Sequence, residues 1–258
     1  MLIGILCVLG VSFAEKIVLS PSPKKITKTI ELDEHDSSRI LITLIGGFIG
    51  LTFNFFLLIY IVEAISPLEV FSISSWGIPH TLNFIISFLL IDLLHYISHR
   101  LHHQLPLLWR FHRLHHSEKK LDALTSLLHH PFDVISSFVI NVIGYLIFDI
   151  PVIAIFYHSC AVLLHAPLSH IKLFLPEKFD RFISMIFVTP NFHSAHHSLD
   201  FKESNSNFGI IFSFWDILFG TVAKFSLSRL AKMKFGIELK QSPNSSSLKE
   251  YLINPFIR

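Results

Sequence analysis

The chain has 258 residues, enough for one compact domain and a further segment, and its net charge of +2 does not indicate a nucleic-acid partner. Hydrophobic residues make up 51% of the sequence and charged residues only 16%, against roughly 25% charged residues in a soluble domain. Together with a mean hydropathy of +0.56, this composition indicates a membrane-embedded protein. The two cysteines, Cys7 and Cys160, lie in apolar runs and exclude a disulfide-rich scaffold.

The first 39 residues differ from the rest of the chain. Residues 2–14 are apolar, but this run is shorter than the roughly 20 residues that a spanning helix needs. Its Ser-Phe-Ala ending resembles a signal-peptide cleavage site, yet no basic region precedes it. The segment therefore fits either a signal or a helix on the membrane surface, and residues 15–39 are expected to be a polar linker.

Four apolar stretches follow and predict an all-α bundle of about four transmembrane helices. They cover residues 40–65, 79–97, 132–150 and 151–169. Only Asp149-Ile150-Pro151 separates the last two, which is typical of a tight turn between helices. Lys and Arg are concentrated in residues 98–131 and 170–258, and the positive-inside rule places both regions on the cytoplasmic side.

Histidine is the most unusual part of the composition, because 15 of the 17 histidines fall between His95 and His197. Neutral imidazole is the commonest side-chain metal ligand. Residues at spacings of three and four lie on one face of a helix, whereas adjacent residues diverge by about 100° and can serve two neighbouring metals. The motifs with this spacing are HxxxH at His95 and His99, and HxxHH at His112, His115 and His116 and again at His193, His196 and His197.

Each motif has a simpler interpretation when it is taken alone. The HxxxH pair could be polar residues at the membrane interface. The first HxxHH, with Arg110 and Arg113, could be a cationic helix that contacts lipid phosphates. The presence of two HxxHH copies and one HxxxH in the same chain favours a histidine-ligated di-metal centre instead.

Further polar residues near the motifs are candidates for the same site. A lone histidine inside a membrane span is costly and is a functional candidate, so we expect His165 to be another ligand. Metal-bound histidines usually donate their other N–H to a carboxylate or carbonyl. The residues expected to give such support or to cap a helix are Asp92, Asp122, Asn191 and Asn207. His130 is expected to be a supporting residue or an extra metal ligand. The histidines without regular partner spacing are expected to be exposed, interfacial or supporting residues: His102, His103, His129, His158 and His170.

In this order the motifs resemble those of the fatty acid hydroxylase/sterol desaturase superfamily of integral-membrane di-iron oxidases. The resemblance covers roughly residues 40–222 and rests on Asp92 to Arg100, Leu108 to Ser117, Asp122 to Thr125, His130-Pro131, His165, Thr189 to Ser198, Asn207 to Gly209 and Trp215 to Thr221. It differs from residues frequent in the superfamily at Leu128, Pro167 and Ser194, none of which removes a ligand. It implies a membrane-embedded catalytic domain at residues 40–222, with a cytoplasmic-side helical cap that holds the di-metal centre. Residues 1–39 would precede this domain, and residues 223–258 would form a polar tail.

The resemblance also implies the chemistry. We expect O2-dependent di-iron hydroxylation of a C–H bond in a sterol or fatty-acyl lipid, with two Fe ions, O2 as co-substrate, and zinc as a substitute metal in isolated protein. Desaturation by the same family is the close alternative. The chain contains no GxGxxG or CxxC motif. A separate electron donor, such as a cytochrome b5-like protein, a ferredoxin or a reductase, is therefore implied.

A zinc-dependent membrane enzyme or a metal transporter is a more remote alternative. Transporters place polar ligands near the membrane midplane, whereas these histidines cluster at the inner ends of the predicted spans, and no HExxH motif is present. The preferred interpretation is a multi-pass membrane protein with its active site on the cytoplasmic side. Its membrane would be the plasma membrane in a bacterium or the endoplasmic reticulum in a eukaryote.

Overall fold

The fold is all-α, as the sequence predicted. The computed structural model describes residues 10–11, 34–52, 60–61, 72–223, 225–237 and 247–256. Within these ranges the chain forms helices and no strand, and its β-type pairings are two isolated bridges, Phe187–Phe212 and Ser198–Phe235. The apolar run at residues 2–14 lies almost entirely outside the described residues. The division of the chain at residues 39 and 222 stays a prediction.

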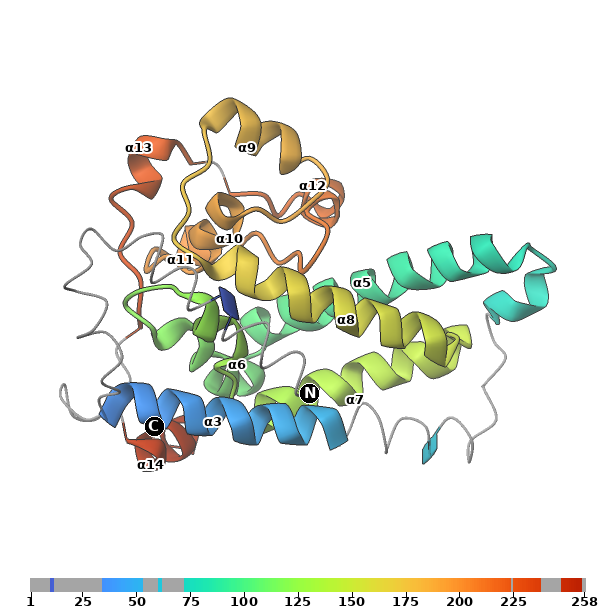
Figure 1. Ribbon diagram of the computed structural model, residues 1–258, viewed down its shortest axis with the longest axis horizontal. Coiled ribbons are helices and arrows are strands. Elements are labelled where there is room, and N and C mark those ends of the chain that lie inside the picture. Colours follow the sequence, from blue (N-terminus) through green and yellow to red (C-terminus); the bar gives the residue numbers. More distant parts are fainter. Residues whose placement is uncertain are drawn as a thin grey trace.

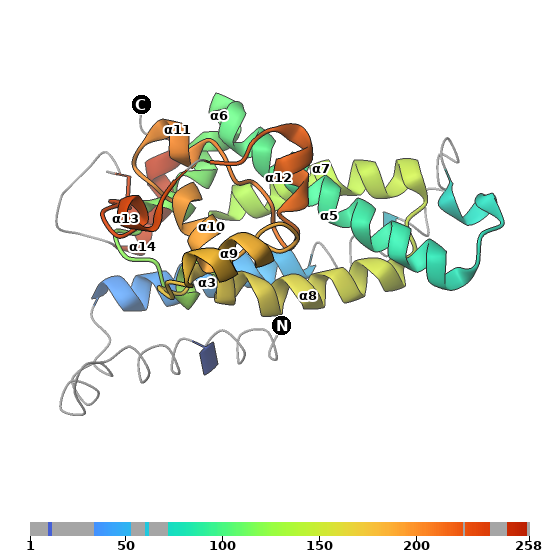
Figure 2. The same ribbon diagram turned by 90° about the horizontal axis from the view of Figure 1, so that it is seen from above.

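Three long helices form the membrane part of the molecule. They are α5 (His80–Gln104), α7 (Pro131–Phe148) and α8 (Val152–His170), and each is long and apolar enough to cross a membrane. α5 packs against both α7 and α8 (Figures 1 and 2). Asp149, in the left-handed conformation at a φ of 49°, ends α7, and Pro151 precedes α8, so the predicted turn between the two helices is confirmed. α5 continues past residue 97, the end of its predicted span, and this extension carries further histidines.

A fourth helix, α3 (Glu34–Leu51), packs along α7 (Figure 1). A Cβ atom at Gly46 would lie 3.2 Å from the carbonyl oxygen of His129, so a larger residue there would press against the backbone before α7. At the other end of the helix, buried Arg39 donates to Asp122 at 2.7 and 3.1 Å. The apolar part of α3 within the described residues is Ser37–Gly50, shorter than the three long helices. The fourth span therefore stays a prediction.

Short helices cover the end of the bundle where α5 and α8 finish and α7 begins, and we call them the cap (Figure 1). Prolines at the first position favour the start of several of them, because the missing N–H is not needed there. The elements of the cap are α6 (Pro106–His112), η3 (His115–Ser117), η4 (Ala123–Leu127), α9 (Glu177–Ile183), α10 (Pro190–His196), α11 (Phe201–Ser204), α12 (Phe214–Phe219), α13 (Leu227–Leu230), α14 (Leu248–Ile253) and η5 (Asn254–Phe256). The short turn η2 (Ile73–Trp76) lies before α5.

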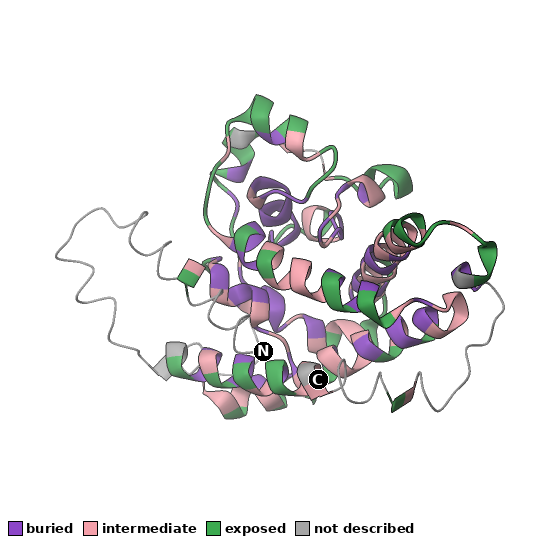
Figure 3. Ribbon diagram, turned by 45° about the vertical axis from the view of Figure 1, so that its right-hand side comes forward, coloured by how far each residue is buried: buried purple, intermediate pink, exposed green. Residues whose placement is uncertain are grey.

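Burial differs sharply between the long helices and the cap. Exposed apolar side chains, such as Ile85, Ile143 and Phe156, line the outer faces of α5, α7 and α8, which are largely green and pink in Figure 3. In α10 of the cap, every residue from Asn191 to His196 is buried. An apolar outer face fits contact with lipid, and the buried polar residues of α10 lie where the histidines gather.

Candidate metal centre

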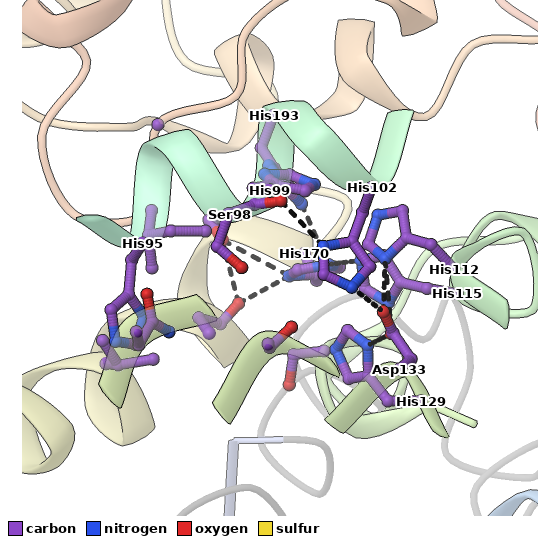
Figure 4. A pocket seen from close by; sticks show the side chains of 18 residues that line it. His95, Ser98, His99, His102, His112, His115, His129, Asp133, His170 and His193 are labelled. Atoms are coloured by element: carbon purple, nitrogen blue, oxygen red, sulfur yellow. Dashed lines mark hydrogen bonds and ion pairs between the residues drawn. The ribbon is translucent and has the colours of Figure 1, made fainter. Parts of the chain in front are cut away.

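Separate segments of the chain bring histidines to the capped end of the bundle. The last turns of α5 carry His99 and His103, and the last residue of α8 is His170. The cap contributes the two HxxHH motifs, one on α6 and η3 and the other on α10. Figure 4 shows side chains from these segments pointing toward one another around a shared space. Each ring is positioned by a helix end, so the site depends on how the four segments pack.

The histidines form two groups in which one ring nitrogen of each member lies within 4.8 Å of those of the others. The five-histidine cluster consists of His99, His103, His112, His116 and His196. The four-histidine cluster consists of His115, His170, His193 and His197. The rings of His116 and His197 stack at 4.4 Å, so the two clusters adjoin. In both HxxHH motifs the two adjacent histidines enter different clusters.

Hydrogen bonds orient the rings of the five-histidine cluster. The Nδ1–H groups of His99 and His196 donate to the carbonyl oxygens of Phe208 at 2.9 Å and Ser206 at 2.7 Å. His112 Nδ1 lies 3.3 Å from both carboxylate oxygens of Asp133. A histidine held in this way through Nδ1 presents Nε2 to a metal. The Nε2 atoms left buried and without a hydrogen-bond partner are those of His103, His112, His116 and His196.

In the four-histidine cluster the Nε2 atoms themselves meet. His170 Nε2 lies 3.2 Å from that of His115 and 2.9 Å from that of His193, and His193 Nε2 lies 3.1 Å from that of His197. Nitrogen ligands about 2.1 Å from one ion are about 3.0 Å apart in an octahedral site and about 3.4 Å apart in a tetrahedral one. The observed separations are close to the octahedral value, so the four-histidine cluster fits a metal ion, and in the five-histidine cluster one ring nitrogen of each member lies within 4.8 Å of the others.

Burial keeps the histidines of the cap uncharged. It lowers the pKa of His196 to about 3. The pKa values of His115, His116, His193 and His197 fall well below their usual range, first because of burial and then because of the neighbouring histidines. Burial also lowers the pKa of His112, although Asp133 opposes this effect. Neutral imidazole is the form that binds metals, so these rings are ready to ligate.

Two of the predicted ligands lie outside both clusters. His95 Nε2 is 3.1 Å from the hydroxyl oxygen of Tyr145, and its ring lies 4.9 Å from that of His158. His165 has a buried Nε2 with no hydrogen-bond partner and is in neither group. The other seven predicted histidines are brought together.

Two histidines that the sequence analysis assigned to supporting roles, His103 and His170, lie in the clusters. His103 follows His99 by four residues, so α5 uses the HxxxH pair one turn nearer the cap than His95 and His99. His170 follows His165 by five residues, and α8 continues through Pro167 to deliver it. The spacing of His99 and His103 was a signal available in the sequence. His170 has no such signal.

The polar residues expected to support the ligands mostly hold the protein backbone. Asp122 caps η4, and His130 Nδ1 accepts from the backbone N–H of Phe132 at the start of α7. Asn191 donates to Leu175 O at 2.9 Å. None of these three side chains belongs to either cluster.

Asn207 has an indirect role in the site. Its amide donates to Phe192 O at 2.7 Å and accepts from the backbone N–H of Ala223 at 2.7 Å. It thereby fixes the segment whose carbonyl groups at Ser206 and Phe208 orient His196 and His99. This support acts through the backbone of its neighbours.

Asp92 and Asp133 are buried acids on the long helices. Asp92 accepts from His158 Nε2 at 3.0 Å and Trp215 Nε1 at 3.0 Å, away from the clusters. Asp133, which the sequence analysis missed, contacts His112 and lies 2.6 Å from His129 Nδ1. Its position in the first turn of a predicted span, after two histidines and a proline, was the only sequence signal.

A cavity of about 180 Å³ adjoins both clusters. It lies between α5, α7 and α8, and Figure 4 shows His95 on one side of it and His112 and His115 on the other. Polar side chains line much of its wall, including Ser98, Ser137 and Asn141. The clusters therefore face a space large enough for part of a ligand.

Known proteins resemble this chain over the same region. The model of the fatty acid hydroxylase family matches residues 84–221. Ornithine lipid hydroxylase of Rhizobium tropici is 30% identical over 126 residues, which are 49% of this chain and 37% of that protein. Alkylglycerol monooxygenase is 28% identical over 150 residues in Caenorhabditis elegans (57% of this chain, 28% of that protein) and 30% over 138 residues in Danio rerio (54% and 30%). The chain spans about a third of the length of these relatives, and no solved structure matches it.

Proposed function

The chain belongs to the fatty acid hydroxylase family, and we propose that it is an integral-membrane enzyme that hydroxylates a C–H bond of a lipid with O2 at a di-iron centre. The observation that carries this proposal is the pair of adjoining, buried histidine clusters at one end of three apolar helices. Nine neutral nitrogen ligands are too many for one ion and suit two.

We assign one iron to each cluster. His99, His103, His112, His116 and His196 would hold the first ion, and His115, His170, His193 and His197 the second. Iron bound by such ligands would activate O2 and supply the oxidant that breaks the C–H bond. The buried walls of the site keep water away from this chemistry, and the carbonyl groups of Ser206 and Phe208 keep the rings aimed at the ions.

The substrate class follows from the membrane part and from the relatives. Two relatives are named for an ornithine lipid and for alkylglycerol. In this chain the cavity lies between helices whose outer faces are apolar, so a lipid could reach it from the bilayer. A sterol or fatty-acyl lipid is the proposed class.

Electrons would come from a separate protein on the cytoplasmic side. The concentration of Lys and Arg in residues 98–131 and 170–258 supports this orientation. Lys119 and Lys120 are exposed just after the first HxxHH motif. They form a basic edge where an acidic donor, such as a cytochrome b5-like protein or a ferredoxin, would dock.

Metal analysis combined with a lipid assay tests the proposal. We expect about two iron ions per chain in protein purified in detergent, and none when His112, His115 and His116 are replaced together by Ala. With labelled O2 and a reductant, the wild-type protein should insert the label into a membrane lipid, and the variant should not. A folded wild-type protein that binds no metal, or that leaves every lipid unlabelled when iron-loaded, would overturn the proposal.

A further inference from the structure

Part of the wall of the cavity beside the clusters is polar, and this part lies on the long helices. Asp133, Ser137 and Asn141 are spaced by four residues along α7 and all line it, so they form one stripe on the helix face. Ser98 of α5 and Ser169 of α8 also line it. Polar residues inside a membrane bundle are costly, and their presence indicates a function.

Apart from histidine nitrogens, two buried atoms of the described part of this wall have no hydrogen-bond partner. They are Asn141 Oδ1 and Ser98 Oγ, and both side chains are more than nine-tenths buried. Leaving a buried polar atom unpaired is unfavourable, because the atom has lost water and gained nothing in return. A ligand that pairs with both atoms would remove this cost.

The chemistry of the wall restricts that ligand. A carboxamide oxygen only accepts hydrogen bonds, so the group facing Asn141 Oδ1 must donate one. Among the described residues that line the cavity there is no Lys or Arg, and the acidic one, Asp133, is already paired with histidines. A phosphate or carboxylate placed at Asn141 would face an acceptor oxygen, with no lysine or arginine beside it among these residues.

From this arrangement we propose that Asn141 and Ser98 form a subsite for an uncharged hydrogen-bond donor of the lipid substrate, a hydroxyl or an amide N–H. This inference rests on the proposed function, since it names the substrate class of the same site. Asn141 is two turns further into the bundle than Asp133, about 12 Å along the helix axis. Ser98 directly precedes His99 on α5, so the donor group would be held close to the five-histidine cluster.

Three probes with the same sixteen-carbon chain separate the chemistries. Hexadecan-1-ol is a neutral donor, 1-methoxyhexadecane is a neutral acceptor only, and hexadecyl phosphate is an anion. Each is titrated into iron-loaded protein in detergent without O2, and binding is measured from the rise in unfolding temperature. We expect the alcohol to bind about tenfold more tightly than the other two. Equal binding of the ether would overturn the subsite, and so would binding of the phosphate that is tighter than that of the alcohol and is weakened by Asn141→Leu.

Variants of α7 identify the residue responsible. Asn141→Leu keeps the volume but removes the acceptor, and it should weaken binding of the alcohol to the level of the ether while leaving the ether unchanged. Ile143→Leu, on the exposed side of the same helix, is the matched control and should alter neither. If Asn141→Leu binds the alcohol as tightly as the wild-type protein does, the proposed subsite would be overturned. If Asn141→Leu does not fold, the comparison of probes on wild-type protein still decides.

The result for the subsite can be separated from the result for the proposed hydroxylase activity. Preference for the alcohol with no oxidised lipid in any assay would support the subsite and count against the hydroxylase. Oxidised lipid without any preference among the probes would do the reverse.

Discussion

The two histidine clusters differ in how their rings are held. In the five-histidine cluster, His99, His112 and His196 are each fixed through Nδ1 by a carbonyl or carboxylate outside the cluster. In the four-histidine cluster, His170 is fixed through Nδ1 by Ala166 O, whereas His115 Nδ1 and His193 Nδ1 are buried without a partner. Three of the five rings in the first site are thus oriented by the protein before an ion arrives, although His116 Nδ1 has no partner among the described residues, and the second site depends more on the ion itself.

Replacing ligands has the largest expected effect and tests the membership of both clusters. His103→Ala and His170→Ala should each remove one iron per chain and lower lipid oxidation by more than about a hundredfold. His95→Ala and His165→Ala are matched controls on the same two helices, and they should keep both ions. Iron measured by elemental analysis in all four variants decides the assignment. If His95→Ala and His165→Ala lose iron while His103→Ala and His170→Ala keep both ions, the assignment of ligands would be reversed.

Replacing Asp133 should weaken the oriented cluster selectively. Asp133→Asn removes the charge that faces His112, and we expect iron affinity or turnover to fall by about 10- to 100-fold. The loss should be as large in a His170→Ala background, which keeps only the ion of the five-histidine cluster. In a His103→Ala background the remaining iron should be retained. Equal losses in both backgrounds would contradict a specific role at His112.

Chelation compares the two sites directly. We expect a chelator to remove iron from His103→Ala protein, which keeps the four-histidine site, several-fold faster than from His170→Ala protein, because rings without external hydrogen bonds reorient more easily. The release of iron is followed by absorbance of the chelate. The unfolding temperature should fall as iron leaves, since a bound metal stabilises the folded state. The opposite order of release would show that external hydrogen bonds do not control retention.

The smallest effect is expected at the surface next to both clusters. Lys119→Glu with Lys120→Glu should slow turnover with an acidic protein donor by a few-fold, and less so at high salt, because steering by exposed charges is screened. Turnover with a small artificial reductant should be unchanged. Lys178→Glu on α9, an equally exposed site, serves as the control. Equal slowing with both reductants would exclude docking at Lys119 and Lys120.

The sequence predicted those features that depend on local periodicity. The apolar stretches located α5, α7 and α8, and the turn at Asp149 to Pro151 was identified from its residues. The divergence of adjacent histidines also predicted that each HxxHH motif would serve two sites, and the two adjacent histidines of each motif do enter different clusters. In such cases the neighbours along the chain decide which side chains share a face.

The features that the sequence analysis did not predict depend on how the helices pack. Both the pair His95–His99 and the pair His99–His103 have the HxxxH spacing, and only the rotation and depth of α5 select the second. His170 meets His193 because the end of α8 lies against α10, which no local pattern records. Asp133 likewise acquires its role from α6, on which His112 lies.

Asp92 depends on hydrogen-bond partners that are synthesised later than α5. It is fully buried on α5, and its partners include His158 on α8, the backbone N–H groups of Ile211 and Phe212, and Trp215 of the cap. During synthesis this acid enters the bilayer long before residues 211–215 leave the ribosome, and an unpaired acid there is unfavourable. Docking of the late-made cap therefore supplies three of the four hydrogen bonds to an acid on an early-made helix, and a chain that stops short of residue 211 would keep the bond from His158 and lose the other three.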